Sequence, residues 1–129
     1  MKTITAFMCA LALSPLAAFA ADYPEISHAE LKKAIEEKKV VLLDVNGSES
    51  WKDGHIPGAL DFTATKKELA AKLPSDKGSL VVAYCGNENC PAYAAGAKAA
   101  QELGYTNVKH YKPGIAGWVS KGEKTEKGS

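Results

Sequence analysis

Two short, nearly continuous apolar runs constrain the fold most strongly: residues 40–45 (VVLLDV) and residues 79–84 (SLVVAY). Runs of this length without a regular polar alternation are typical of strands buried on both faces of a parallel sheet. A shorter strand is predicted at 108–111, after the turn at 105–107. The chain is therefore expected to build its core around a parallel sheet.

Helical patterns alternate with these strands, at Ser27 to Lys38, at Thr65 to Leu73 and at Pro91 to Gly104. The first begins with a capping box, because Ser27 is followed three residues later by Glu30. In the third, Pro91 suits the first turn of a helix and Gly104 suits its C-terminal cap. Strands that alternate with helices predict an α/β fold, in which a mostly parallel sheet is covered by helices on both faces.

The first twenty residues have the layout of a secretory signal peptide: Lys2 near the start, a short apolar stretch and a small-x-small ending at residues 18–20. Cleavage after Ala20, or one residue later, would remove Cys9. It would leave a domain of residues 21–120 in a bacterial periplasm, with a polar tail at 121–129 that is expected to fray. A retained N-terminal anchor is the alternative. After cleavage no stable membrane insertion is expected, because no later segment is apolar enough to span a bilayer.

Charge argues against several classes of partner. All 16 basic residues are lysines, and 15 Asp and Glu residues nearly balance them. Nucleic acids and anionic membrane surfaces are bound by clustered positive charge, which a neutral chain without arginine does not supply. No nucleic-acid partner is therefore predicted. No cofactor is expected either.

Cys85 and Cys90 lie in the segment YCGNENCPAY (residues 84–93), directly after the second apolar run. In a parallel sheet the carboxyl ends of the strands border the ligand crevice. The loop and the helix after it offer unpaired backbone N–H groups, which stabilise negative charge and so favour the nucleophilic thiolate. Cys85 is therefore a candidate nucleophile, although a small buried residue at a strand end fits the local pattern equally well.

Three segments resemble the rhodanese family of single-domain sulfurtransferases: LLDVNGSESWKDGHIPGAL (42–60), VVAYCGNENCPAYAAGAKAAQELGY (81–105) and NVKHYKPGIAGW (107–118). The run GHIPGA at 54–59 and the closing Gly114-Ile115-x-x-Trp118 are rather specific to that family. The resemblance implies a three-layer α/β/α fold with a central, mostly parallel sheet. It also implies an enzyme that takes sulfane sulfur from a small sulfur-containing donor, holds it as a persulfide and passes it to a thiol or cyanide.

The resemblance also assigns roles to residues of this chain. It makes Cys85 the sulfur carrier and the backbone N–H groups of the loop after it a cradle; the loop residues are Gly86, Asn87, Glu88, Asn89 and Cys90. Several N–H donors around an anionic terminal sulfur would stabilise it well. Asp44 and His55 are expected to support the loops structurally rather than to take part in the reaction.

The loop departs from the family pattern in its charge. Asn46 stands where the family usually has Arg, and the one charged residue between Cys85 and Cys90 is Glu88. Arginine is the residue that binds oxyanions in a bidentate manner. Thiosulfate is therefore a doubtful donor, and the phosphatase and arsenate-reductase relatives, which grip an oxyanion through Arg, are disfavoured.

Cys90 leaves several hypotheses open. As a resolving or regulatory thiol it would attack the persulfide on Cys85, release sulfide and leave a disulfide. A thiol redox protein would use the same Cys85–Cys90 couple, whereas a small buried residue at a helix start would have no chemical role. For the domain as a whole, a sulfurtransferase is the first hypothesis. The alternative is a catalytically weak binding module, whose ligand would be a sulfur-containing molecule or a periplasmic protein partner. A metal site is not expected, because Cys-x4-Cys is a loose spacing and His28, His55 and His110 lie in unrelated segments.

Overall fold

The structure, a computed structural model, describes residues 23–128, so the predicted signal segment lies outside the described residues. Its centre is a four-stranded sheet in the order β2-β1-β3-β4, whose strands are β1 (Val40–Asp44), β2 (Leu60–Asp61), β3 (Leu80–Tyr84) and β4 (Asn107–Tyr111). Neighbouring strands pair in parallel throughout this sheet. Because parallel strands end at the same edge, the segments that follow them gather there.

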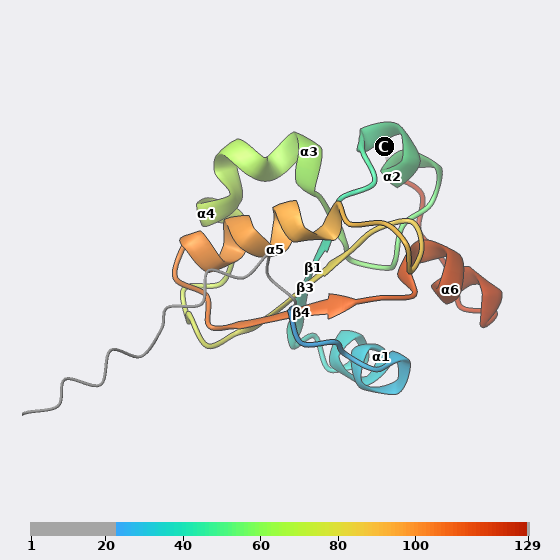
Figure 1. The fold of residues 1–129 in the computed structure, drawn as a ribbon, viewed down its shortest axis with the longest axis horizontal. Coiled ribbons are helices and arrows are strands. Elements are labelled where there is room, and N and C mark those ends of the chain that lie inside the picture. The colour runs from blue at the N-terminus through green and yellow to red at the C-terminus, as the bar shows by residue number, and fades with distance from the viewer. Residues whose placement is uncertain (1–22, 129) are drawn as a thin grey trace, which may run out of the picture.

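Helices cover both faces of the sheet (Figure 1). They are α1 (His28–Glu36), α2 (Ser48–Asp53), α3 (Phe62–Thr65), the 3-10 helix η1 (Lys66–Glu68), α4 (Leu69–Lys72), α5 (Tyr93–Glu102) and α6 (Gly114–Ser120). Helices α3, α4 and α5 lie on one side of the strands and α1 on the other, while α6 lies beyond the carboxyl end of β4. Within residues 23–128, no helix has both the length and the apolar character that crossing a membrane requires.

Alternate residues of each strand belong to different halves of the core. Leu43 and Ala83 pack with side chains of α4 and α5, whereas Leu42 and Val82 pack with Leu31 of α1 and with α6. A strand that is apolar on both faces has two layers to cover it, which explains the continuous runs in the sequence. The predicted three-layer α/β/α architecture with a parallel sheet is confirmed.

The helix predicted over 65–73 is wrong in its start and in its continuity. The segment begins at Phe62, because the Asp61 side chain accepts a hydrogen bond from the backbone N–H of Ala64 and caps the first turn. It then passes through η1 before α4, so it is a broken helix. The third predicted helix begins at Tyr93 rather than at Pro91.

The C-terminal segment is not frayed as predicted. The backbone of Glu126 exchanges two hydrogen bonds of 2.9 Å with His55, and the N–H of Gly128 donates to the carbonyl of Lys52. The carbonyl of Lys124 accepts from the indole N–H of Trp118 at 2.8 Å. The chain therefore ends against α2, as the position of the C-terminus in Figure 1 also shows.

Candidate functional site

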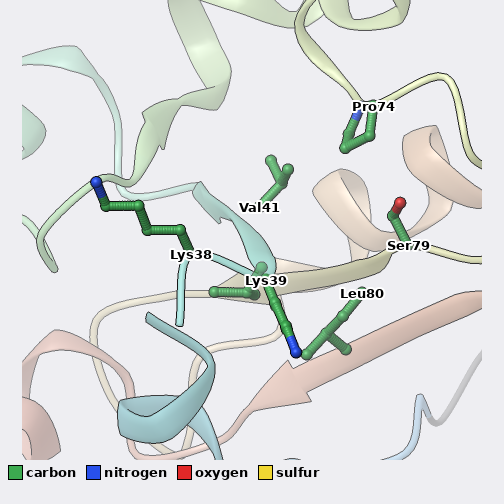
Figure 2. Close-up of a pocket in the computed structure, with 7 residues that line it drawn as sticks. Lys38, Lys39, Val41, Pro74, Ser79 and Leu80 are labelled. Atoms are coloured by element: carbon green, nitrogen blue, oxygen red, sulfur yellow. The ribbon is translucent and has the colours of Figure 1, made fainter. Parts of the chain in front are cut away.

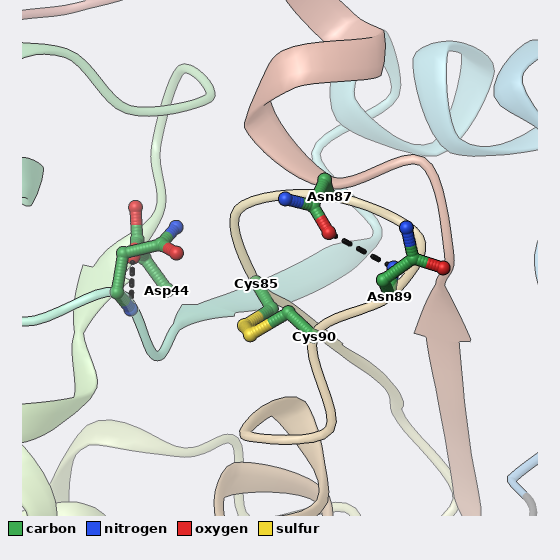
Figure 3. Close-up of a disulfide and its surroundings, with 6 residues drawn as sticks. Asp44, Cys85, Asn87, Asn89 and Cys90 are labelled. Carbon is green, nitrogen blue, oxygen red and sulfur yellow. Dashed lines mark hydrogen bonds between the residues drawn. A yellow bond between two sulfur atoms is a disulfide. The ribbon is translucent and has the colours of Figure 1, made fainter.

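The loop of residues 85–90 lies at the edge of the sheet where the four strands end. Cys85 follows β3 directly, and α5 begins three residues after Cys90. Asp44, the last residue of β1, lies beside the start of the loop in the adjacent strand (Figure 3). The sequence prediction that the two cysteines occupy one loop at this edge agrees with the structure.

A disulfide joins Cys85 to Cys90 (Figure 3). Their Cα atoms are 6.0 Å apart, which is an ordinary separation for a disulfide. Cys85 is buried, with 2% of its surface exposed, whereas Cys90 is half-buried. The alternative in which Cys90 is merely a small buried residue at a helix start is therefore wrong: it is bonded to Cys85 and is the more accessible of the two.

Asn87 organises the oxidised loop. Its backbone carbonyl accepts a hydrogen bond from the N–H of Cys90 at 3.2 Å, and its side-chain oxygen accepts from the N–H of Asn89 at 2.9 Å (Figure 3). The N–H of Ala94, in the first turn of α5, donates to the carbonyl of Pro91. In this oxidised form, the N–H groups of Asn89 and Cys90 are thus bound within the loop and not free to surround an anion.

Helix α6 holds the loop from its other side. The N–H groups of Ile115 and Ala116 donate to the carbonyls of Cys85 and Gly86, at 3.0 and 2.9 Å. Gly114, which starts the helix, has a φ of +64°, and a β-carbon added to it would lie 2.5 Å from the Cys85 carbonyl oxygen. The close approach of α6 therefore requires glycine at this position.

The structural importance of α6 was missed by reasoning from the sequence. The closing motif at 114–118 identified the segment, but nothing in its spacing indicated that its first N–H groups bind the cysteine loop. The signal available was Gly114 itself, because a glycine at the start of an apolar segment often marks a close backbone approach.

Asp44 lies in the interior, with 1% of its surface exposed. One carboxyl oxygen accepts from the Tyr84 hydroxyl at 2.7 Å and the other from the backbone N–H of Asn46 at 2.8 Å, while the Tyr84 oxygen accepts from the N–H of Ile56. Burial raises the pKa of Asp44, and burial together with the Asp44 carboxylate raises that of Tyr84. These contacts hold β1, β3 and the segment after α2 together, so the role of Asp44 is to stabilise the structure around the loop.

Asn46 contacts the cysteine loop. A β-carbon added to Gly86 would lie 3.3 Å from the Asn46 side-chain oxygen, so this amide lies against the loop backbone. Its side-chain nitrogen is buried, and the Asn46 side chain and backbone N–H both lower the pKa of the Asp44 carboxyl against the effect of burial. The Asn46 amide therefore lies between the Asp44 carboxyl and the cysteine loop.

The three histidines occupy separate places. His55 is buried, stacks on Trp51 with ring centroids 4.2 Å apart and shares a 2.7 Å hydrogen bond with the Trp51 carbonyl. His110 stacks on Tyr93, and burial lowers its pKa. His28 contacts the Tyr111 hydroxyl at 2.8 Å. The structure therefore uses them in packing and hydrogen bonding, and residues 23–128 contain no group of side chains that could hold a metal ion.

A hollow of about 390 Å³ is lined by residues at the starts of β1 and β3 (Figure 2), and the cysteines follow the other end of β3. Its walls come from the start of β1, the start of β3 and Pro74, with Lys38 and Lys39 beside it. Lysine is the only ionisable residue type in this lining. The loop at the carboxyl edge, which contains the two sulfur atoms, is therefore the candidate functional site.

Comparison with known proteins identifies the family to which the chain is similar. The family model described as a rhodanese-like domain matches residues 27–121. The HTH-type transcriptional regulator Rv0324 of Mycobacterium tuberculosis is 32% identical over 123 residues, which cover 91% of this chain and 53% of that protein. The thiosulfate sulfurtransferase GlpE of Coxiella burnetii is 32% identical over 65 residues, covering 50% of this chain and 61% of that protein. The chain thus spans only about half to three fifths of the length of these curated relatives.

Solved structures agree on the fold. The human single domain sulfurtransferase TSTD1 superposes with a TM-score of 0.61 at 23% identity, covering 76% of this chain and 96% of that one. Similarity at this level of identity establishes the shared α/β fold, whereas chemistry has to be argued from the residues of the loop.

Proposed function

Because this chain belongs to the rhodanese-like domain family, we propose that it is a sulfurtransferase that holds sulfane sulfur as a persulfide on Cys85 and passes it to a thiophilic acceptor. The observation that supports this most strongly is the position of Cys85. It lies buried at the carboxyl end of β3, in a loop whose first two carbonyls are bound by α6. A thiol held there is shielded from bulk water and fixed in position, which favours transfer over hydrolysis.

Reduction of the Cys85–Cys90 disulfide precedes this reaction, because a disulfide sulfur is no nucleophile. In the reduced loop, the N–H groups of residues 86–88 are the donors that we assign to the anionic terminal sulfur, because those of Asn89 and Cys90 already bind Asn87. The Asn46 side chain adjoins the same loop and interacts with the Asp44 carboxyl, so we assign it to holding the loop in place.

The charge of the loop selects among sulfur donors. Its one charged side chain, Glu88, is exposed, and the chain contains no arginine to offset it. A doubly charged donor such as thiosulfate is repelled by this carboxylate, whereas the persulfide of a small thiol has less charge to repel. We therefore propose a donor of low negative charge and a thiol acceptor.

The N-terminal segment supports a place of action outside the cytoplasm. Residues 1–20 have the layout of a signal peptide, and an oxidising compartment would favour formation of the disulfide. We propose that the protein works in a bacterial periplasm, which fractionation of cells that express the full chain tests directly. Recovery of the protein with its first residues intact in the cytoplasm would contradict this location.

The test of sulfur transfer is uptake of sulfur by the reduced protein. The wild type, Cys85→Ser and Cys90→Ser are reduced, desalted and mixed with benzenethiosulfonate. The peptide between Lys77 and Lys98, which excludes Cys9, is then examined by mass spectrometry. Cys85→Ser takes up no sulfur. Cys90→Ser keeps the carrier and gains one sulfur atom, which cyanide then removes as thiocyanate. Failure of Cys90→Ser to gain sulfur would contradict the proposal and leave a binding module as the better explanation.

The disulfide also favours a second candidate function, a thiol redox protein built on the Cys85–Cys90 couple. In that case both cysteines are equally necessary, because neither alone can exchange a disulfide with a partner through a closed cycle. Equal loss of activity in Cys85→Ser and Cys90→Ser, with no sulfur gained by either, would favour this candidate over sulfur transfer.

A further inference from the structure

We propose that Cys90 is a resolving thiol, which attacks the persulfide on Cys85 and releases its sulfane sulfur as sulfide. The inference rests on the proposed function, because it requires a persulfide on Cys85. It adds an activity to that function: the protein reduces sulfane sulfur to sulfide at the expense of its own two thiols. Each such event leaves the Cys85–Cys90 disulfide as its product.

The positions of the two cysteines favour this reaction over transfer to an external thiol. The loop places the two sulfur atoms within bonding reach, with Cα atoms 6.0 Å apart. The bonds from α6 to the Cys85 and Gly86 carbonyls hold one end of the loop, and the bond from the Cys90 N–H to Asn87 holds the other. A thiol so placed has an effective concentration on the order of millimolar or higher, which small external thiols must exceed to compete.

The step balances without any further oxidant or reductant. The Cys90 thiolate attacks the Sγ atom of Cys85, the Sγ–Sγ bond forms, and the bond from Cys85 to the terminal sulfur breaks. The electron pair leaves with the terminal sulfur, which takes a proton and departs as hydrosulfide. The sulfane sulfur is thereby reduced, and the two cysteine sulfurs are oxidised to the disulfide.

The observed disulfide also indicates which sulfur Cys90 attacks. Its sulfur is bonded to the Sγ of Cys85, so the loop can bring Cys90 to the inner sulfur of the persulfide. Attack on the outer sulfur would move the persulfide to Cys90 and would form no Cys85–Cys90 bond. The loop geometry therefore favours sulfide release over a relay of sulfur from one cysteine to the other.

Reopening of the disulfide requires two thiol equivalents, from one dithiol or from two monothiols, and the burial of the two cysteines determines where the first thiolate attacks. Cys85 is 2% exposed and Cys90 is half-buried, so an incoming thiolate reaches Cys90 first. The mixed disulfide then forms on Cys90, and Cys85 leaves as the thiolate, which the loop is proposed to stabilise. Each sulfide released consumes two thiol equivalents, so the activity is coupled to the thiol supply of its compartment.

The test is a single turnover without external thiol. The reduced, desalted protein is mixed anaerobically with one equivalent of benzenethiosulfonate, whose by-product is benzenesulfinate, so that any sulfide comes from the persulfide. The wild type is expected to release about one equivalent of sulfide, and its peptide between Lys77 and Lys98 is expected to lose two hydrogens. Cys90→Ser is expected to retain one extra sulfur and to release at least about tenfold less sulfide.

Two further variants separate chemistry from folding. Cys90→Ala removes the thiol without adding a hydroxyl and is expected to behave as Cys90→Ser does. Ala95→Ser, on the exposed part of α5, keeps both cysteines and is expected to release sulfide as the wild type does.

Glutathione added to the oxidised wild type is expected to form its mixed disulfide on Cys90, which fragmentation of the same peptide locates.

The outcomes distinguish this inference from the function on which it rests. A wild type that retains its persulfide as long as Cys90→Ser does would overturn the resolving role and leave sulfur transfer intact. Extra sulfur located on Cys90 of the wild type would also overturn it, in favour of a relay. If Cys90→Ser and Cys90→Ala take up no sulfur at all, sulfur transfer itself is wrong. A glutathione adduct on Cys85 would overturn the assigned site of reopening.

Discussion

Glu88 is the side chain that most separates this loop from a typical oxyanion site. It is exposed in the middle of a loop that otherwise has no charge, and the chain contains no arginine to offset it. Exposed charges interact by roughly 0.2–1 kcal/mol per pair, so one carboxylate weakens anion binding without abolishing it. The choice of donor is therefore expected to depend on this single residue to a measurable degree.

Reversing the charge at this position tests that dependence. Glu88→Lys is expected to raise kcat/KM for thiosulfate about tenfold, because an attraction replaces a repulsion for each of the two donor charges. Benzenethiosulfonate has one charge and is expected to gain only about threefold. Steady-state assays with both donors at low and high salt provide the measurement, and the gain is expected to shrink as salt rises.

Glu102→Lys provides the control for net charge, since it lies at the far end of α5 from the loop. It is expected to leave both donors unaffected. Equal gains in the two charge-reversal variants would mean that the overall charge of the protein, and not the loop, attracts the donor.

At the scale of single residues, the sequence indicated the cysteine pair but left its state open. The spacing of Cys85 and Cys90 allowed a disulfide, a resolving thiol or an inert residue, because five positions in a loop fix no distance by themselves. The distance is set by Asn87, which folds the loop on itself, and by α6. Both are contacts of this particular backbone, and local propensity does not reveal them.

At the scale of elements, the contact between α6 and the cysteine loop is the feature on which the site depends most. Gly114→Ala is expected to destabilise the protein by about 2–4 kcal/mol, because a left-handed conformation and a clash with a backbone carbonyl both oppose the methyl group. The loss is expected to be accompanied by slower uptake of sulfur on Cys85. Urea unfolding of the oxidised protein and the uptake assay of the reduced protein measure the two effects.

Gly122→Ala is the matched control at the other end of α6. Gly122 has a φ of +78°, similar to the +64° of Gly114, but a β-carbon added there would meet no atom within 4 Å. It is therefore expected to cost about 1 kcal/mol for conformation alone. Equal destabilisation by the two substitutions would show that the approach of α6 to the loop is not tight.

The elements that the sequence predicted well are those with continuous apolar character. Strands β1, β3 and β4 appear where they were expected. Strand β2 has two residues and is too short to produce a pattern, and α6 is a seven-residue helix with glycine at two positions. Helix α6 is stabilised by tertiary contacts, namely its bonds to the Cys85 and Gly86 carbonyls, and these override its weak intrinsic propensity.

At the scale of the whole molecule, the folded unit extends beyond the segment that defines the family. The family match covers residues 27–121. On one side of it, the backbone of His110 in β4 exchanges hydrogen bonds of 3.0 and 2.8 Å with Ile26 and Pro24. On the other side, residues 124–128 bind Trp118, His55 and Lys52. Both flanking segments thus close the edges of the domain, so the boundary of the stable unit differs from that of the family pattern.

This arrangement predicts a large effect from a small truncation. Removal of residues 124–129 deletes the acceptor for the Trp118 indole, both backbone bonds to His55 and the bond from the Gly128 N–H to the Lys52 carbonyl. At about 1 kcal/mol for each of these net hydrogen bonds, the loss is roughly 4 kcal/mol, equivalent to a fall in Tm of about 15 °C or more. Lys127→Ala, which keeps the backbone and changes only an exposed side chain, is expected to leave Tm unchanged. Thermal unfolding followed by circular dichroism compares the three proteins in the oxidised form. An unchanged Tm in the truncated protein would mean that the polar tail frays in solution, as its composition alone suggests. The segment around His55 would then be stable without its hydrogen bonds to the tail.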